Sequence, residues 1–371
     1  MDNSSCSCGL HPLGGTDMSE DRPRRSDLLK TPIQMVELTR GMTIKELADQ
    51  FSNTSFQARN LAQCVEIYRK MTDTDSSHTV FMGLAGSVIA AGLRKVVTQL
   101  IEMGMVDVVV TTGAVVYQDY YQSMGYKHYR GAVESDDVLL HEYMIDRIYD
   151  TYVDEEKFRE TDISIGNLLE SLGGGRYSTR EFLRILGERC ADDGDSILGA
   201  ACREDIPIYC PAISDSSIGI GLATSYRRQR DAGVGMDEIF VLDTIRDNYE
   251  MAQIMNGSPS TGAVYLGGGV PKNYINDAVV MADMIFGGQD GHEYAIQVTM
   301  DRAEWGGLSG STLGEAKSWG KIDAEATHQM VHVEISVALP IIASAVLEGR
   351  EFRKRKGPRF VWDSDRLVEI R

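Results

Sequence analysis

The sequence predicts an α/β fold in which a largely parallel sheet carries helices on both faces. Short apolar runs recur along the chain, and helical patterns lie between most of them. The run VDVVVTTG at 106–113 is β-branched and apolar, which is typical of a strand buried on both faces. A second run, TVFMGL at 79–84, leads through glycine into a helix.

The chain of 371 residues divides into three expected parts. Residues 1–27 are rich in Ser, Gly, Asp and Pro and have few large apolar side chains, so we expect a disordered arm. Residues 28–350 form the α/β domain, and residues 351–371 form a C-terminal tail. The basic run at 350–359 is interpreted as a solvated helix end or tail.

The domain begins with a helical N-terminal segment. TIKELADQF at 43–51 opens with threonine and has glutamate three residues later, the spacing of a capping box, and 55–71 has apolar residues at helical spacing. A third helix is expected at 87–104. Residues 125–200 predict a helical insertion, with the glycine-rich stretch at 171–178 as a turn.

The strands follow from the apolar runs. They are expected at 79–84, 106–113, 206–212, 238–243, 263–269 and 294–299. Residues 328–349 then predict a strand followed by a helix that is interrupted at Pro340.

Composition excludes several classes of function. With 37 basic and 55 acidic residues the net charge is −18, a field that repels nucleic acid and attracts cations. No apolar run of about 18 residues predicts a membrane span, and no signal segment is recognised. Six scattered cysteines favour a reducing, cytoplasmic setting. Cys6 and Cys8 with His11 lack a second ligand pair, so no metal site is expected.

Ligands of such sheets bind at the carboxyl ends of the strands, here 83–87, 111–114, 212–217 and 267–272. In LGGGVPK, at 266–272, three glycines join a strand to a helix. Glycines there allow a phosphate to approach the backbone and the helix N-terminus, although a plain tight turn has the same appearance. Asp215 either binds a ribose hydroxyl or caps the next helix.

Lys321 lies close to Trp319 and Glu315 in GEAKSWGKI. A lysine nucleophile has to be neutral, and burial beside apolar or aromatic surface favours the neutral amine. A solvated surface lysine is the alternative.

In SWGKI, LGGGVPK, DVVVTT, PAISD and SFQARN the sequence resembles the deoxyhypusine synthase family, and the resemblance runs from about residue 50 to 348. It implies a Rossmann-like domain that forms homotetramers with sites at a dimer interface. It also implies NAD and spermidine as ligands. An aminobutylidene group would pass through a lysine imine to an acceptor amine, which is a lysine of translation initiation factor 5A in deoxyhypusine synthase. Homospermidine synthases, a related group, use putrescine instead.

The resemblance also implies roles for single residues. Lys321 matches the catalytic lysine, and Trp319 and Glu315 match the polyamine pocket. The residues expected to contact NAD are Ser87, Thr112, Gly113, Asp215, Gly268 and Glu334. Glu334 stands where the family has an aspartate, and Ser87 where it has an asparagine.

Other positions depart from the family pattern around the donor amine. Gln118 replaces a catalytic-site glutamate, Asn273 replaces a histidine, and Ile220 and Leu308 replace two donor-binding aspartates. A buried ammonium group needs a paired acceptor, so a replacement carboxylate is required. The candidates are Glu304, Asp119 and Asp301.

Three interpretations of function remain open. The first is a polyamine transferase with a small-amine acceptor, as in homospermidine synthesis. The second is an authentic deoxyhypusine synthase that modifies factor 5A. The third is a non-catalytic homo-oligomer that binds NAD or polyamines.

Overall fold

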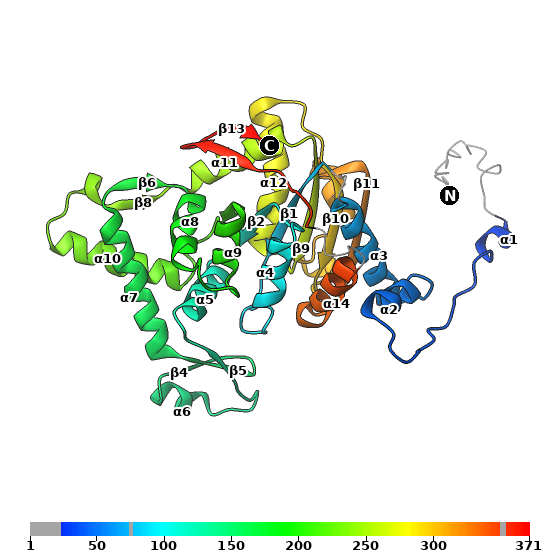
Figure 1. The fold of residues 1–371 in the computed structure, drawn as a ribbon, viewed down its shortest axis with the longest axis horizontal. Helices are drawn as coiled ribbons and strands as arrows, with labels where there is room; N and C mark the ends of the chain where they lie inside the picture. The colour runs from blue at the N-terminus through cyan, green and yellow to red at the C-terminus, as the bar shows by residue number, and fades with distance from the viewer. Residues whose placement is uncertain (1–23, 74–76, 349–353) are drawn as a thin grey trace, which may run out of the picture.

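The computed structural model describes residues 24–73, 77–348 and 354–371. A six-stranded sheet at its centre confirms the predicted fold class, because every neighbouring pair of strands is parallel (Figure 1). Its order is β11-β10-β9-β1-β2-β7. The strands are β1 (His78–Leu84), β2 (Val108–Thr111), β7 (Ile208–Tyr209), β9 (Ser260–Leu266), β10 (His292–Val298) and β11 (Ile322–Val331).

The connections reverse direction in the middle of this sheet. From β1 the chain moves outward through β2 to β7, and it then returns to the other side of β1 and continues through β9, β10 and β11. This is the 3-2-1-4-5-6 strand order of dinucleotide-binding sheets. The reversal leaves a switch point between β1 and β9, where such sheets bind their ligands.

Two apolar clusters cover the two faces of the sheet, because successive side chains of a strand point to opposite sides. On β1, Val80 and Met82 pack into one cluster and Phe81 into the other. The first cluster contains residues of α2 (Ile44–Phe51), α3 (Phe56–Met71), α4 (Arg94–Glu102), α5 (Gly113–Ser123), α9 (Ile197–Glu204) and α14 (Ile335–Glu348). The second contains residues of α11 (Thr244–Gly257), α12 (Gly269–Phe286) and α13 (Leu313–Ala316).

The first helices agree with prediction, and others differ. The Thr43 hydroxyl and the Glu46 side chain form the expected capping box of α2. The helix expected from residue 87 begins only at Arg94, after Gly92 with φ 78°. The helix expected to break at Pro340 is continuous, because buried neighbours such as Leu339 and Ile342 hold it in place.

The insertion contains more strand than predicted. Here β3 (His128–Arg130), β4 (Ile145–Ile148) and β5 (Thr151–Asp154) form an antiparallel sheet that stands away from the body together with α6 (Asp137–Glu142) (Figure 1). The predicted turn at 171–178 contains β6 (Gly175–Tyr177). This strand pairs with β8 (Phe240–Leu242), so the run at 238–243 is a strand outside the main sheet. The remaining helices of this part are α7 (Glu155–Leu172), α8 (Thr179–Arg189) and α10 (Ser217–Asp231).

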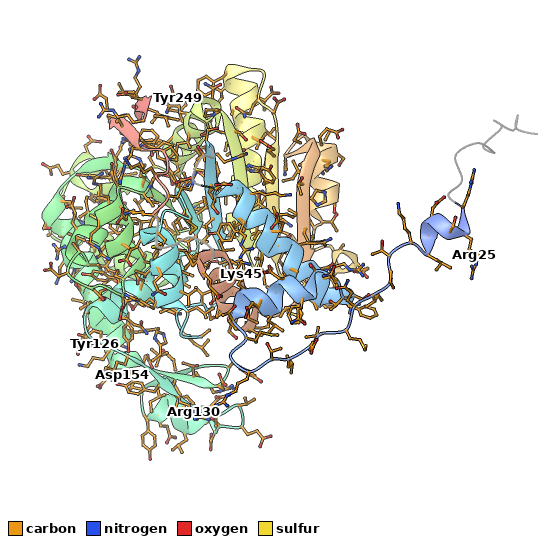
Figure 2. All side chains as sticks on the ribbon, turned by 45° about the vertical axis from the view of Figure 1, so that its right-hand side comes forward. Arg25, Lys45, Tyr126, Arg130, Asp154 and Tyr249 are labelled. Carbon is orange, nitrogen blue, oxygen red and sulfur yellow. The ribbon has the colours of Figure 1, made fainter. Side chains whose placement is uncertain are left out.

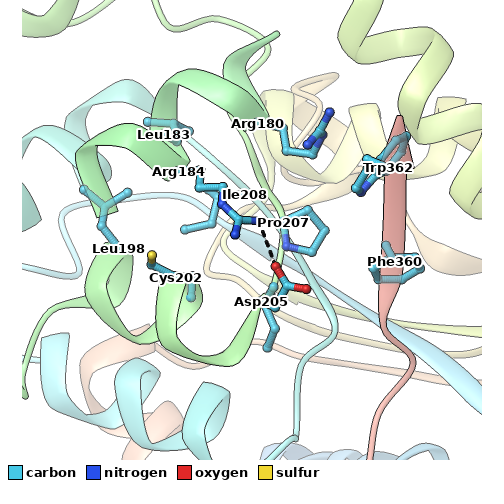
Figure 3. Close-up of a pocket in the computed structure, with 12 residues that line it drawn as sticks. Arg180, Leu183, Arg184, Leu198, Cys202, Asp205, Pro207, Ile208, Phe360 and Trp362 are labelled. Carbon is cyan, nitrogen blue, oxygen red and sulfur yellow. Dashed lines mark hydrogen bonds and ion pairs between the residues drawn. The ribbon is translucent and has the colours of Figure 1, made fainter. Parts of the chain in front are cut away.

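The C-terminal residues form an antiparallel hairpin of β12 (Phe360–Asp363) and β13 (Arg366–Ile370). The Arg180 guanidinium lies 4.3 Å from the centroid of the Trp362 ring. Figure 3 shows the cavity that this hairpin closes against α8 and α9, with an ion pair of 2.8 Å between Arg184 and Asp205 at its wall.

Arg355 corrects the solvated interpretation of the basic run, because its side chain is 1% exposed. Its Nη1 lies 2.9 Å from both carboxylate oxygens of Asp107 and donates to the Gly104 carbonyl. At the other end of the chain, α1 (Arg25–Leu28) and an exposed extended segment lead away from the body. Figure 2 shows Arg25 far from the body and Lys45, on α2, against it. Residues 1–23, with Cys6, Cys8 and His11, lie outside the described part of the chain.

Candidate active site

Loops at the carboxyl ends of β1 and β9 form the two sides of the switch point. The Ala85 amide donates to the Leu266 carbonyl at 3.0 Å, and the Gly267 amide donates to the Val298 carbonyl at 2.8 Å. Gly86 and Gly267 have φ angles of 85° and 78°, which favour glycine. The two turns are therefore tied to each other and to the sheet.

Glycine is also required where these loops approach their neighbours. A Cβ atom at Gly268 would lie 2.4 Å from Ser309 Cα, and one at Gly113 would lie 2.2 Å from Ser216 Oγ. Gln297 fixes the first contact, because its Nε2 donates to the carbonyls of Gly267 and Ser309 at 2.8 Å each. The backbone at Gly268 is thus held against Ser309, whereas a Cβ atom at Gly86 would meet nothing within 4 Å. The open backbone at Gly86 is what the approach of a dinucleotide phosphate requires.

The structure places the residues expected to contact NAD around this edge. Thr112 is the N-cap of α5, and its side chain makes no capping bond. Ser87 and Asp215 are exposed. Ser216, not Asp215, is the N-cap of α10, so the alternative in which Asp215 caps the helix is wrong. Glu334 lies beyond β11, where its carboxylate accepts from the Ser336 amide at 2.9 Å.

Lys321 lies in a second group of residues, directly before β11. Its Nζ is 2.8 Å from Asp277 Oδ1, donates to Asn273 Oδ1 at 3.3 Å and lies 5.4 Å from the centroid of the Trp319 ring. Asn273 Nδ2 donates in turn to Asp277 Oδ2 at 2.7 Å. The side chain of Lys321 is 15% exposed, so the surface-lysine interpretation does not describe it.

Helix α12 links the two groups. It begins at the glycine turn, and Asn273 and Asp277 follow on one face at helical spacing. Asp277 lies roughly 12 Å along the helix axis from Gly269, at the usual rise of about 1.5 Å per residue. In a single chain, Lys321 therefore lies beside the third turn of α12 rather than at the glycine turn itself.

A second lysine, missed in the sequence, is buried in this region. Lys272 Nζ donates to Gln297 Oε1 at 2.9 Å and to Ser311 Oγ at 3.0 Å. The pKa of Lys272 is lowered to about 8, mainly by burial; the charge of Glu315 opposes this shift, and the charge of Lys321 adds to it. Lys272 holds the segment that leads into α13. Its apolar neighbours in VPK gave no sign of this contact, 39 residues away.

The other residues expected in the polyamine pocket differ in burial. Glu315 is exposed, and its side chain forms a capping box with Thr312 at the start of α13. The T-x-x-E spacing of this box is visible in the sequence. Trp319 is 67% exposed, and Gly320 after it has φ 67°. Gln118 is buried on α5, and its Oε1 has no hydrogen-bond partner among the described residues.

None of the proposed replacement carboxylates pairs with Lys321 in the structure. Asp119 is fully buried and pairs with Arg94 at 2.6 Å, so its candidacy is wrong. Asp301 bonds to Ser309, and Glu304 is exposed. Asp277 is the carboxylate that the structure brings to the lysine. Its spacing of four residues from Asn273 was the available signal, but only the fold shows which face of α12 meets Lys321. Ile220 and Leu308 are both exposed.

The described residues were also compared with the requirements of a membrane span and of a metal site. No helix there is long and apolar enough to cross a bilayer. Among the same residues no group of three or more His, Cys, Asp or Glu side chains is arranged to hold a metal ion.

The strand order defines a Rossmann-like α/β protein, and the enclosed Lys321 lies beside its helix α12. The chain belongs to the deoxyhypusine synthase family. The family model described as "Deoxyhypusine synthase" matches residues 46–346. This is a family of transferases that move an aminobutyl group.

The chain is similar in sequence to individual proteins over most of their length. The chain is 43% identical to "Probable deoxyhypusine synthase 2" of Methanosarcina mazei over 88% of this chain and 93% of that protein. It is 38% identical to the "Deoxyhypusine synthase-like protein" of Chlorobaculum tepidum over 92% and 97%. The crystal structure of a "putative deoxyhypusine synthase" from Entamoeba histolytica has the same fold. The TM-score is 0.58 at 16% identity, with 90% of this chain and 100% of that chain covered.

Proposed function

We propose that the protein is an NAD-dependent transferase that moves an aminobutyl group between amines through an imine on Lys321. The observation that carries this proposal is the enclosed Lys321 amine, held between a carboxylate, an amide and an aromatic ring. Lysine suits the reaction because a primary amine forms and exchanges imines. The same carboxylate and ring provide the contacts that cationic amines bind.

The residues at the carboxyl ends of the strands fit NAD. The open glycine backbone at Gly86, the start of α5, which has no side-chain cap, and the exposed Asp215 carboxylate offer phosphate and ribose contacts. The unpaired Gln118 Oε1 is a further acceptor for a ligand N–H group. When bound, NAD would take a hydride from the donor carbon beside the nitrogen that is to leave, and later return it.

Lys321 performs the transfer between these two events. Its neutral nitrogen attacks the imine carbon of the oxidised donor, and a C–N bond forms. The bond to the leaving amine then breaks, and that amine departs with a proton. The acceptor amine displaces Lys321 in the same way, and the returned hydride reduces the new imine to a secondary amine. The sequence is redox-neutral, because the hydride that leaves the donor is returned to the product.

For the acceptor we favour a small amine, as in homospermidine synthesis. The departures at Gln118, Asn273, Ile220 and Leu308 alter the clamp for the donor and support a changed amine specificity. The names of the relatives support the alternative, in which the acceptor is a lysine of a factor 5A protein. A non-catalytic binding role is the third candidate, and the enclosed lysine argues against it.

We also infer a cytoplasmic homotetramer with each site completed at a subunit interface. In a single subunit, large apolar side chains near the site are exposed to solvent, among them Trp319, Trp305 and Val270. A neighbouring subunit would cover them. Light scattering at micromolar protein should give about four times the mass of one 41.0 kDa chain, and a monomer would contradict a shared site.

The test of function is chemical trapping of the imine. The protein is incubated with NAD and spermidine, putrescine or homospermidine, reduced with borohydride and digested for mass spectrometry. We expect a butylamine-sized addition on Lys321 that requires both NAD and a donor. A release assay for the small amine, run with and without a candidate factor 5A protein, separates the two acceptors. Absence of any addition with every donor would support the non-catalytic alternative.

A further inference from the structure

Asp277 is the nearest anionic partner of the lysine nucleophile, and it binds through both carboxylate oxygens. One oxygen pairs with Lys321 at 2.8 Å, and the other accepts from Asn273 at 2.7 Å. Asn273 closes the triangle by accepting from Lys321 at 3.3 Å. The amide therefore orients the carboxylate and leaves a single oxygen for a cation.

This pairing conflicts with the chemistry expected of Lys321. An opposite charge at hydrogen-bond distance favours the protonated amine, whereas only the neutral amine attacks an imine. With Asp277 in place, the Lys321 nitrogen is held in an ion pair and is not free to attack. Reaction requires another cation to take over the carboxylate.

The carboxylate is accessible to such a cation. Asp277 is 44% exposed, whereas Lys321 is 15% exposed, so an incoming group reaches the carboxylate from the solvent side. The Trp319 ring beside the pair is itself exposed and attracts ammonium groups. Buried Lys272 interacts with the charge of Lys321 from the protein side. This positive charge disfavours a second ammonium group beside that of Lys321.

We propose that Asp277 is the anchor for the terminal ammonium group of a di- or polyamine donor, and that donor binding releases Lys321 from it. This inference rests on the proposed function. The donor's ammonium replaces that of Lys321 at Asp277 Oδ1, and the proton that Lys321 loses passes to water. The reacting carbon of an aminobutyl donor lies at the other end of its butyl chain. Asp277 therefore selects donors by the spacing between their cationic end and that carbon.

The first test measures the resting ion pair without NAD or donor. Lysines of the intact protein are methylated with formaldehyde and cyanoborohydride between pH 6 and 10, and the rate at Lys321 is read by mass spectrometry. In Asp277→Asn, Lys321 should be methylated several-fold faster at pH 8 than in the wild type, because no carboxylate holds its amine in an ion pair. Lys317, which donates to the Ala324 carbonyl, is the internal reference. An unchanged rate would overturn the inference.

The second test measures donor recognition. Asp277→Asn should raise the KM of the donor about tenfold, the size expected for a lost charge-assisted hydrogen bond, with a smaller change in kcat. Asp277→Glu should recover part of the loss. Asp283→Asn is the matched control, because it removes the same charge from α12 where Asp283 caps the Gly288 amide. An unchanged KM with an intact Lys321 addition would contradict the anchor.

Failure of the two proposals can be separated. If the wild type never forms an addition on Lys321 but Lys321 is methylated faster in Asp277→Asn, the ion pair is real and the transferase function is wrong. If the wild type forms the addition and Asp277→Asn changes neither the methylation rate nor KM, the function stands and the role of Asp277 is wrong.

Discussion

Acidification is expected to destabilise the protein through His292, the first residue of β10. Its side chain is 0% exposed, Nδ1 bonds to the Thr261 hydroxyl at 2.8 Å, and Nε2 has no partner among the described residues. Burial lowers the pKa of His292 to about 4, against about 6.5 in an unfolded chain. The unfolded state therefore binds the proton more tightly, and stability is lost as the pH falls from about 6.5 towards 4.

The size of the effect follows from the two pKa values. At pH 5 the unfolded histidine is mostly protonated and the folded one mostly neutral, which costs about 2 kcal/mol relative to neutral pH. Asp247 acts in the opposite direction: burial raises its pKa to about 7, so protonation of this carboxyl favours the folded state. The comparison must therefore be made between variants and not on the wild type alone.

The assay is urea unfolding of wild type and His292→Gln at pH 7 and pH 5. The difference in unfolding free energy between the two pH values should be about 2 kcal/mol smaller in the variant. His141→Gln, at an exposed position on α6, should behave like the wild type. The reasoning is refuted if wild type and His292→Gln lose the same free energy on acidification.

Three further predictions concern the cofactor edge, the nucleophile and the C-terminal segment. Gly268→Ala should weaken NAD binding at least tenfold in calorimetry, because the added Cβ meets Ser309, while Gly307→Ala, with open space around it, should not. Lys321→Arg keeps the charge but cannot form an imine, so it should abolish transfer and leave the calorimetric NAD affinity within about twofold; retained transfer would exclude the covalent route. Arg355→Met leaves a buried carboxylate unpaired and should lower the unfolding free energy by about 3–5 kcal/mol in urea; a loss below about 1 kcal/mol would show that the pair is not stabilising.

The sequence predicted the parts of the fold in which local pattern and burial agree. The runs at 79–84 and 106–113 are apolar because both of their faces are covered, and they became β1 and β2. The sequence predicts a turn where β6 lies, because Gly175–Tyr177 carry no apolar alternation. That strand exists through its pairing with β8, which is distant in the chain.

The candidate site was predictable only in part for the same reason. The lysine motif and the glycine turn are local signals, but only the glycine turn lies at the carboxyl ends of the strands. Lys321 comes directly before β11, at the amino ends of the parallel strands. The partner of Lys321 is not local: Asp277 comes from another element, and nothing near it in the sequence marks the face of α12 that it occupies. By sequence alone Asp119 is an equally good candidate, whereas in the structure its carboxylate bonds to Arg94 and to the start of α9.

The position of Arg355 has a consequence for biosynthesis. Asp107 comes just before β2, in the first third of the chain, and its carboxylate is buried together with the guanidinium that neutralises it. During translation the N-terminal part leaves the ribosome first, so the centre of the sheet forms before its counter-charge has been made. In a nascent chain that has not reached residue 355, the Asp107 carboxylate must stay solvated or become protonated. Completion of the core is thus delayed until the last part of the protein has been synthesised.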